Sequence, residues 1–278
     1  MKTSFIVGLY NKYIDDLNNV REYQTKLYSR KGYSRVIREY PEPRPYEKYH
    51  LFRTLAYFAL EYTRGFERSV LGRRLKPQFD DIEREVTYLL IREYRPSTVV
   101  EISPGGGWST SWILNAIRDN GRGKLCSYDL VDHCTKTVPR DLSESRWVFI
   151  KGDVKKNIET LSDEIDYLFL DSDHSADFAH WYIRNVFPRL RSGSPVSIHD
   201  VFLPRDVLSR DGYTEPGVIL EWLRHREIEY FTASRSEEKA VYYEIMSIKK
   251  KLGIEALIHP YQYNPTIFFL YEPAFKAS

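Results

Sequence analysis

The sequence has few cysteines and no long apolar run. Its 278 residues include only two cysteines, Cys126 and Cys134, which are too few for a disulfide framework or a cysteine-based zinc site. No stretch of about eighteen apolar residues occurs, so we expect no transmembrane helix. The apolar run near the N-terminus spans about six residues and is too short for the core of a signal peptide. These absences predict a soluble, cytoplasmic protein with no membrane partner.

The sequence also lacks a strong charge of either sign. It has 41 basic and 39 acidic side chains and a net charge of +2, which gives no general reason to expect nucleic acid or another polyanion as a partner. Segment 26–48 is a local exception, because it holds seven basic and three acidic residues. This segment could face an anionic ligand, although a solvated helical surface is the simpler interpretation.

Two regions of the chain differ in their sequence pattern. Residues 1–76 are rich in Tyr and Arg, contain the breaker YPEPRPY at 40–46 and lack the alternation typical of strands. We predict that they form a helical N-terminal appendage or lid. Residues 77–278 are predicted to form the main domain, with an insertion around 235–262.

Short β-rich runs alternate with helical patterns in the main domain. A helix is predicted that Asp80 can cap at its start and that Pro96 stops. The strand-like runs that follow it are TVVEI, KLCSYD, WVFI, YLFLD and PVSIHD (98–102, 124–129, 147–150, 167–171 and 195–200). Their alternation with helices predicts an α/β fold, a doubly wound, mostly parallel, Rossmann-like sheet with helices on both faces. EIEYFTA and TIFFLYE could add a final antiparallel strand pair.

A glycine cluster follows the first predicted strand, in the stretch VVEISPGGGWSTSWIL. Gly105 and Gly107 permit a tight turn and allow a ligand to approach backbone N–H groups near a helix N-terminus. Asp129 ends the next predicted strand, where a carboxylate can accept both hydroxyls of a ribose. The combination favours a cofactor that contains a nucleoside. Thr110 replaces the third glycine of the dinucleotide fingerprint, which argues against a nicotinamide cofactor.

The glycine cluster resembles the first motif of class I S-adenosylmethionine-dependent methyltransferases, acid-x-Gly-x-Gly-x-Gly. Ser103 stands where that motif has its first glycine. The resemblance implies S-adenosyl-L-methionine as the cofactor. It also implies binding residues in this loop and at the strand ends, namely Glu101, Ser103, Gly105, Gly107, Ser109, Asp129, Asp153 and Asp171.

A second stretch, IDYLFLDSDHSADFAHWYIRNVFPRLRSGSPVSIHDVF (165–202), is similar to one subgroup of these enzymes. In that subgroup the fourth strand ends in Asp-x-Asp-His and the fifth in His-Asp-Val, and antibiotic- and sugar-modifying O-methyltransferases are among its relatives. The likeness spans about residues 80–225. Because the carboxyl ends of parallel strands meet at one edge of a sheet, Asp171 and the pair His199–Asp200 are expected to converge.

Two ways of activating an acceptor hydroxyl remain open. Asp171, His199 and Asp200 could hold Mg²⁺ or another divalent cation, which would lower the pKa of a bound hydroxyl. An imidazole ligand suits a softer ion than Mg²⁺. Alternatively, His174 or His199 could act as a general base without a metal. Asp173 could simply cap the following helix.

The sequence thus predicts an O-methyltransferase that acts on a hydroxyl of a small molecule, sugar or glycan. Its predicted catalytic residues are His174, His199 and Asp200. One alternative is an NAD-dependent oxidoreductase. Another is a non-catalytic module that binds a cofactor or a polyanion through the basic N-terminal stretch. A homo-oligomer is compatible with the sequence, and the acceptor cannot be identified from it.

Overall fold

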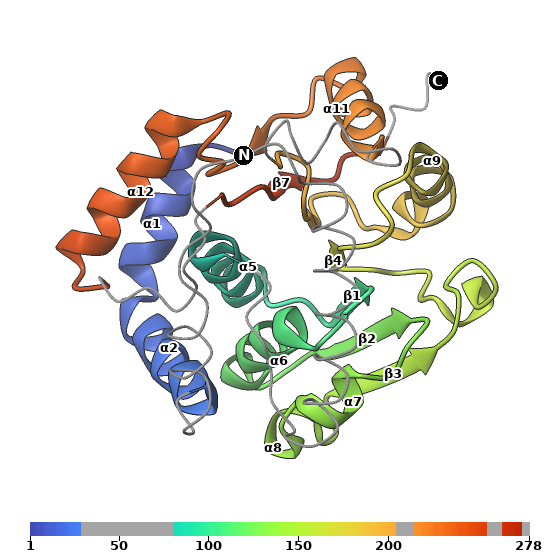
Figure 1. The fold of residues 1–278 in the computed structure, drawn as a ribbon, viewed down its shortest axis with the longest axis horizontal. Coiled ribbons are helices and arrows are strands. Elements are labelled where there is room, and N and C mark those ends of the chain that lie inside the picture. Colours follow the sequence, from blue (N-terminus) through green and yellow to red (C-terminus); the bar gives the residue numbers. More distant parts are fainter. Residues whose placement is uncertain (29–79, 204–213, 255–262, 274–278) are drawn as a thin grey trace, which may run out of the picture.

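The computed structural model describes residues 1–28, 80–203, 214–254 and 263–273. Their centre is a seven-stranded sheet with the order β3-β2-β1-β4-β5-β7-β6 (Figure 1). Its strands are β1 (Thr98–Ile102), β2 (Lys124–Asp129), β3 (Trp147–Lys151), β4 (Tyr167–Leu170), β5 (Pro195–Ile198), β6 (Tyr230–Phe231) and β7 (Ile267–Leu270). Strands β1 to β5 run parallel, whereas β7 pairs antiparallel with both β5 and β6. The predicted fold class is confirmed, including the antiparallel strand pair.

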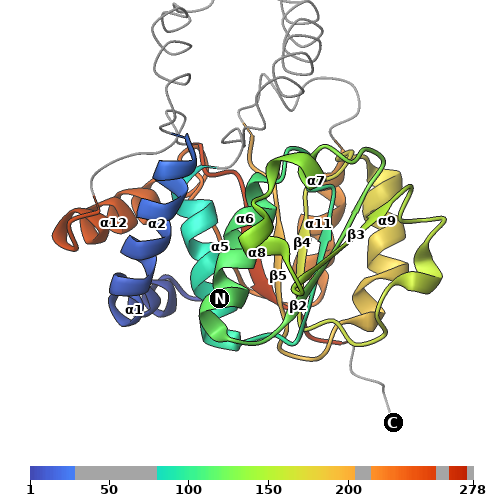
Figure 2. The ribbon, with the colours of Figure 1, turned by 90° about the horizontal axis from the view of Figure 1, so that it is seen from below.

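Helices cover both faces of this sheet. They are α1 (Thr3–Lys12), α2 (Ile14–Tyr28), α5 (Asp81–Tyr94), α6 (Trp108–Asn120), α7 (Cys134–Thr137), α8 (Arg140–Ser143), α9 (Ala176–Asn185), α11 (Glu215–His225) and α12 (Lys239–Lys251), with 3₁₀ turns η1 (Ile158–Thr160) and η2 (Phe187–Arg189). Figure 2 shows α5 and α6 on one side of the sheet, with α1, α2 and α12 outside them. Helices α9 and α11 pack against each other and share a core with the opposite face of the sheet. None of the described helices combines the length and the apolar character needed to cross a membrane.

The two faces of the sheet bury separate cores. Successive side chains of a strand point to opposite faces, and in β4 this separates Tyr167 and Phe169 from Leu168 and Leu170. The first pair packs in the core that includes α5 and α6, and the second pair packs in the core that includes α9 and α11. The uninterrupted apolar run YLFL is therefore buried on both sides, as expected for a central parallel strand.

The boundaries of three elements follow from local chemistry. Helix α5 begins with a capping box in which the Asp80 N–H donates to Glu83 (2.9 Å), and it ends at Tyr94, before Pro96 as predicted, with Arg95 as its C-cap. Strands β4 and β5 end earlier than predicted, at Leu170 and Ile198, so the polar residues that follow them belong to loops. Helix α9 ends at Asn185, and Pro188 lies in the 3₁₀ turn η2 that follows it.

The N-terminal helices share the core of the main sheet. Leu9 of α1 and Leu17 of α2 are buried in the same cluster as residues of α5 and α6. Helix α12, which belongs to the predicted insertion, packs against α1. The predicted domain boundary at residue 76 and most of the basic segment 26–48 lie outside the described residues.

Candidate active site

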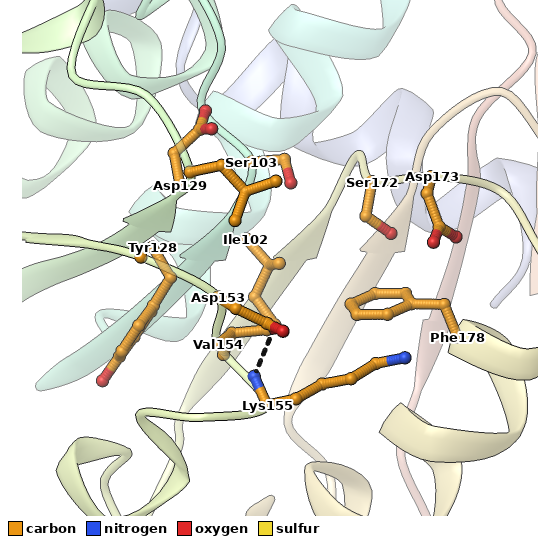
Figure 3. A pocket seen from close by; sticks show the side chains of 12 residues that line it. Ile102, Ser103, Tyr128, Asp129, Asp153, Val154, Lys155, Ser172, Asp173 and Phe178 are labelled. Atoms are coloured by element: carbon orange, nitrogen blue, oxygen red, sulfur yellow. Dashed lines mark hydrogen bonds between the residues drawn. The ribbon is translucent and has the colours of Figure 1, made fainter.

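The candidate cofactor pocket opens where the strands β1, β2, β3 and β4 end. Its lining comes from these strand ends and from the segments that follow them, namely Ile102, Ser103, Tyr128, Asp129, Leu130, Gly152, Asp153, Val154, Lys155, Ser172, Asp173 and Phe178. Figure 3 shows Asp129 and Ser103 at one end of the pocket and Phe178 at the other. Among the predicted cofactor residues, Ser103, Asp129 and Asp153 line the pocket directly.

The glycine-rich loop after β1 is held by Asp129. The Gly105 N–H donates to the Asp129 carboxylate (2.9 Å), and the Ser103 N–H donates to the carbonyl of Tyr128 (2.7 Å). Ser103 adopts a left-handed backbone conformation (φ 65°), so it takes the shape for which glycine is preferred. Only glycine fits at position 107, because a Cβ there would lie 2.6 Å from Cγ2 of Val138.

Glu101 and Ser109, which were also predicted as cofactor residues, lie behind this loop and not on the pocket surface. Glu101 is fully buried and accepts hydrogen bonds from the hydroxyls of Ser109 (2.6 Å), Thr110 (2.9 Å) and Ser127 (2.6 Å). Burial raises the pKa of Glu101 to about 7, although these hydrogen bonds oppose the shift. The carboxyl group thus joins β1, β2 and the start of α6 beneath the loop.

Asp129, Asp153 and Lys155 supply charged groups to the pocket. Burial raises the pKa of Asp129, which also accepts a hydrogen bond from the Val131 N–H (3.1 Å). Asp153 accepts the N–H of Lys155 (2.8 Å), drawn as the dashed line in Figure 3, and the Lys155 ammonium lies 5.1 Å from the centre of the Phe178 ring. An aromatic ring and a carboxylate therefore face the same space from different segments.

The ends of β4 and β5 bring the second group of predicted residues together. Leu170 and Ile198 are paired in register, so Asp171 and His199 directly follow two neighbouring positions. The Nδ1 atom of His199 lies 3.2 Å from Oδ1 of Asp171 and 3.2 Å from Oδ1 of Asp200. The expected convergence of these strand ends is observed.

His174 approaches the same two carboxylates from the loop after β4. Its Nε2 atom lies 3.7 Å from Oδ1 of Asp171 and 3.8 Å from Oδ2 of Asp200. His174 and Asp200 both have left-handed backbones (φ 58° each), an uncommon conformation for residues other than glycine. Such conformations are often found at functional sites, where the surrounding structure holds them.

The charges of this cluster shift the pKa of each of its members. Burial lowers the pKa of His199 and His174, but the surrounding carboxylates outweigh it and raise both, that of His199 strongly. Burial and the charge of Asp171 raise the pKa of Asp200 to about 6, against the opposing charge of His199. The two imidazoles lower the pKa of Asp171, although its burial acts in the other direction. The charged form is therefore stabilised more for Asp171 than for Asp200.

Each histidine has a further carboxylate partner on its other ring nitrogen. Nδ1 of His174 lies 2.9 Å from Oε2 of Glu215, at the start of α11. Nε2 of His199 lies 3.5 Å from Oε2 of Glu83, in the first turn of α5. Neither partner was predicted from the sequence. Glu83 and Glu215 lie far along the chain from the histidines that they contact, 41 positions in the case of Glu215, and no motif links them.

Asp173 supports the start of α9 indirectly. The helix is capped by Ser175, whose hydroxyl accepts the N–H of Phe178 (3.1 Å). Asp173 accepts both the N–H (2.9 Å) and the hydroxyl (2.7 Å) of Ser175. Asp173 also lines the pocket, so its side chain has a structural contact and a surface that faces the cofactor space.

The cluster at the ends of β4 and β5 has the donors that a divalent cation requires. Possible ligand atoms of Asp171, His174 and Asp200 all lie within 4.8 Å of one another. Two carboxylates and an imidazole form a mixed oxygen and nitrogen set that suits several divalent metals. His199 was predicted as the imidazole of this set, whereas the group that the structure brings within 4.8 Å contains His174, and both histidines lie near the same two carboxylates.

Comparison with known proteins identifies the fold. A family model described as a methyltransferase domain matches residues 100–201. No curated protein matches the chain. The structure is similar to the O-methyltransferase TomG from Streptomyces achromogenes, at 16% identity and a TM-score of 0.52 over 82% of this chain and 92% of that one. It is also similar to Rv0187 from MTB, at 13% identity and a TM-score of 0.50 over 78% and 95% of the two chains.

Proposed function

We propose that this chain, which carries a methyltransferase domain of the class I, S-adenosylmethionine-dependent kind, transfers a methyl group to a hydroxyl oxygen of a small molecule or sugar. One observation carries the proposal. A cluster of two carboxylates and two imidazoles, Asp171, Asp200, His174 and His199, lies at the sheet edge that also forms the pocket. A cofactor in the pocket and an acceptor at the cluster would be neighbours.

The pocket offers contacts for each part of S-adenosylmethionine. Asp129 is a carboxylate at the end of β2, where it can accept the two ribose hydroxyls. Asp153 and Phe178 provide a polar and an aromatic surface for the adenine. The loop from Gly105 to Gly107 has no side chains, so the amino acid end could approach its backbone closely. TomG, whose structure contains S-adenosylmethionine and which takes part in tomaymycin synthesis, provides a precedent for a small-molecule acceptor on this fold.

The acceptor hydroxyl must lose its proton as the methyl group arrives. Asp171 and Asp200, with an imidazole as third donor, would hold a divalent cation that lowers the pKa of the hydroxyl. The remaining histidine would take the proton, and both imidazoles lie close enough to the carboxylates for either task. Methyl transfer then depends mainly on holding the oxygen in line with the sulfonium centre.

Calorimetry with S-adenosylhomocysteine and with NADH tests the cofactor. We expect heat of binding with S-adenosylhomocysteine and none with NADH, and the reverse result would favour an oxidoreductase. Absence of binding to S-adenosylhomocysteine would refute the proposed function.

A methyl-transfer screen with sugars, phenols and catechols tests the acceptor. Running each reaction with and without EDTA shows whether a cation takes part, and added Mg²⁺ or Mn²⁺ should restore activity lost to the chelator. The double variant His199→Ala, Asp200→Ala should still bind S-adenosylhomocysteine but lose turnover. Undiminished turnover in that variant would remove these residues from the mechanism.

A further inference from the structure

The start of helix α11 holds His174 at three points. The backbone N–H groups of Thr214 (3.0 Å) and Glu215 (2.8 Å) both donate to the carbonyl of His174. The Glu215 carboxylate lies 2.9 Å from Nδ1 of the His174 ring. The Thr214 hydroxyl accepts the N–H of Ala176 (2.7 Å), two residues further along. A residue with a left-handed backbone is thus fixed both along its main chain and at its ring.

The Glu215 carboxylate is buried at this contact. Glu215 is 2% exposed and His174 is 7% exposed. The phenol of Tyr182 lies close by, and burial together with the charge of Glu215 raises its pKa well above the usual value. An ionised carboxylate in such surroundings is unfavourable unless a specific partner compensates it. The imidazole of His174 is the partner that the geometry provides.

This contact determines which nitrogen of His174 faces the carboxylate pair. A carboxylate at Nδ1 accepts the Nδ1 proton, so the neutral ring carries its lone pair on Nε2. Nε2 is the atom that lies 3.7 Å from Asp171 and 3.8 Å from Asp200. A carboxylate that fixes an imidazole in this way is a common support for both metal ligands and general bases.

We infer that Glu215 is a positioning residue, which holds the His174 ring so that the Nε2 lone pair faces the acceptor site. The inference rests on the proposed function for its consequence in catalysis. Glu215 does not line the cofactor pocket, so it acts through His174. Through Glu215, helix α11 also supports the active site, in addition to packing against α9.

Nuclear magnetic resonance of the full chain labelled with ¹⁵N tests the contact directly, without cofactor or acceptor. At a pH where the ring is neutral, the His174 ring of the native protein should carry its proton on Nδ1, assigned by the loss of its signals in His174→Ala. In Glu215→Leu the proton should move to Nε2. Glu221→Leu is the matched control, because Glu221 is an exposed carboxylate on the same helix, and it should leave the His174 signals unchanged. An Nε2 proton in the native protein would overturn the inference.

A double-mutant cycle tests the consequence for turnover. Glu215→Leu should lower kcat by about 10- to 100-fold and leave the KM for S-adenosylmethionine unchanged. In a His174→Ala background the same substitution should change kcat by less than about twofold, because its effect runs through His174. An equal loss in both backgrounds would show a general structural role and overturn the inference. If Glu215→Leu does not fold, Glu215→Gln serves in the kinetic cycle, with a smaller loss expected because an amide oxygen still accepts the Nδ1 proton, and the tautomer of the native protein decides the resonance experiment.

The two experiments separate this inference from the proposed function. Absence of turnover and of S-adenosylhomocysteine binding in the native protein would refute the proposed function, while the resonance experiment would still decide the contact. Normal turnover in Glu215→Leu, together with native turnover, would refute the inference alone.

Discussion

Glu101 and Ser127 lie opposite each other on the neighbouring strands β1 and β2, and the Ser127 hydroxyl donates a 2.6 Å hydrogen bond to the Glu101 carboxylate. Two hydroxyls from the first turn of α6, those of Ser109 and Thr110, donate to the same carboxylate. The acidic residue of the glycine motif therefore fastens the sheet to the helix that follows the loop. It supports the cofactor site without reaching the pocket.

Replacing Glu101 by Gln should change how stability depends on pH. The pKa of Glu101 is about 7 in the folded protein against 4.5 for an ordinary glutamate. The folded state therefore holds more protons than the unfolded state between these values. The contribution of the Glu101 carboxyl group to the free energy of unfolding is fully present at low pH. It is lost as the pH rises through about 7, and the total loss is roughly 3 kcal/mol. Relative to the native protein, Glu101→Gln should gain stability over this range.

Urea unfolding at pH 5, 6, 7 and 8 measures this difference. Glu159→Gln, which replaces an exposed carboxylate in the turn η1, is the control and should follow the native curve at each pH. If the difference between Glu101→Gln and the native protein is the same at all four pH values, the buried carboxyl does not titrate as described.

Replacing Asp129 by Ala should weaken cofactor binding. Without the carboxylate, the ribose hydroxyls and the Gly105 N–H would lose the acceptor of their hydrogen bonds. Hydrogen bonds to a charged group contribute about 1.5–3 kcal/mol each, so we expect the Kd for S-adenosylhomocysteine to rise roughly 100-fold. Calorimetry measures the change. Asp132→Ala removes a carboxylate that is paired with Lys136 and Lys151 at the surface and should change the Kd less than about twofold. Equal effects of the two substitutions would contradict the assigned role.

Replacing Gly107 by Ala should destabilise the protein more than the same change at Gly121. Both glycines have left-handed backbones (φ 85° and 67°), so a side chain is strained at either position. A Cβ at Gly107 would also lie 2.6 Å from Val138, whereas nothing lies within 4 Å of one at Gly121. Overpacking adds about 1–3 kcal/mol to the backbone strain. Thermal unfolding of the two variants isolates this added term, and equal melting temperatures would mean that the loop moves to accommodate the methyl group.

The sequence predicted those features that depend on the order of elements and on strand ends. Apolar runs and turn residues indicated every strand of the parallel sheet. The topology then placed Asp171 beside His199, because parallel strands end at a common edge. Side-chain pairing across the fold could not be predicted in this way. Glu215 meets His174 only because α11 starts beside the β4 loop, and Glu101 points into the core although its motif suggested a ligand contact.

A buried charge network joins the N-terminal helices to the main domain. Glu85 of α5 accepts a hydrogen bond from the hydroxyl of Tyr10 (2.8 Å) and pairs with Arg21 of α2 and with Lys249 of α12 (2.8 Å). Glu85 and Lys249 are fully buried. One carboxylate thus connects three helices that lie 64 to 164 positions away in the sequence.

Replacing Glu85 by Gln should destabilise the chain by about 3–5 kcal/mol, because the buried ammonium of Lys249 would lose its carboxylate and Arg21, which also pairs with Asp81 (3.9 Å), would lose one of its partners. Glu93→Gln is the matched control on the same helix, since its partner Lys12 is more than half exposed and such pairs contribute at most about 1 kcal/mol. Urea unfolding at neutral pH compares the two variants. Adding Lys249→Met to Glu85→Gln should recover part of the lost stability, because it removes the buried ammonium group that paired with Glu85. A loss no larger than that of Glu93→Gln would mean that water reaches these helices and that the network does not hold them on α5.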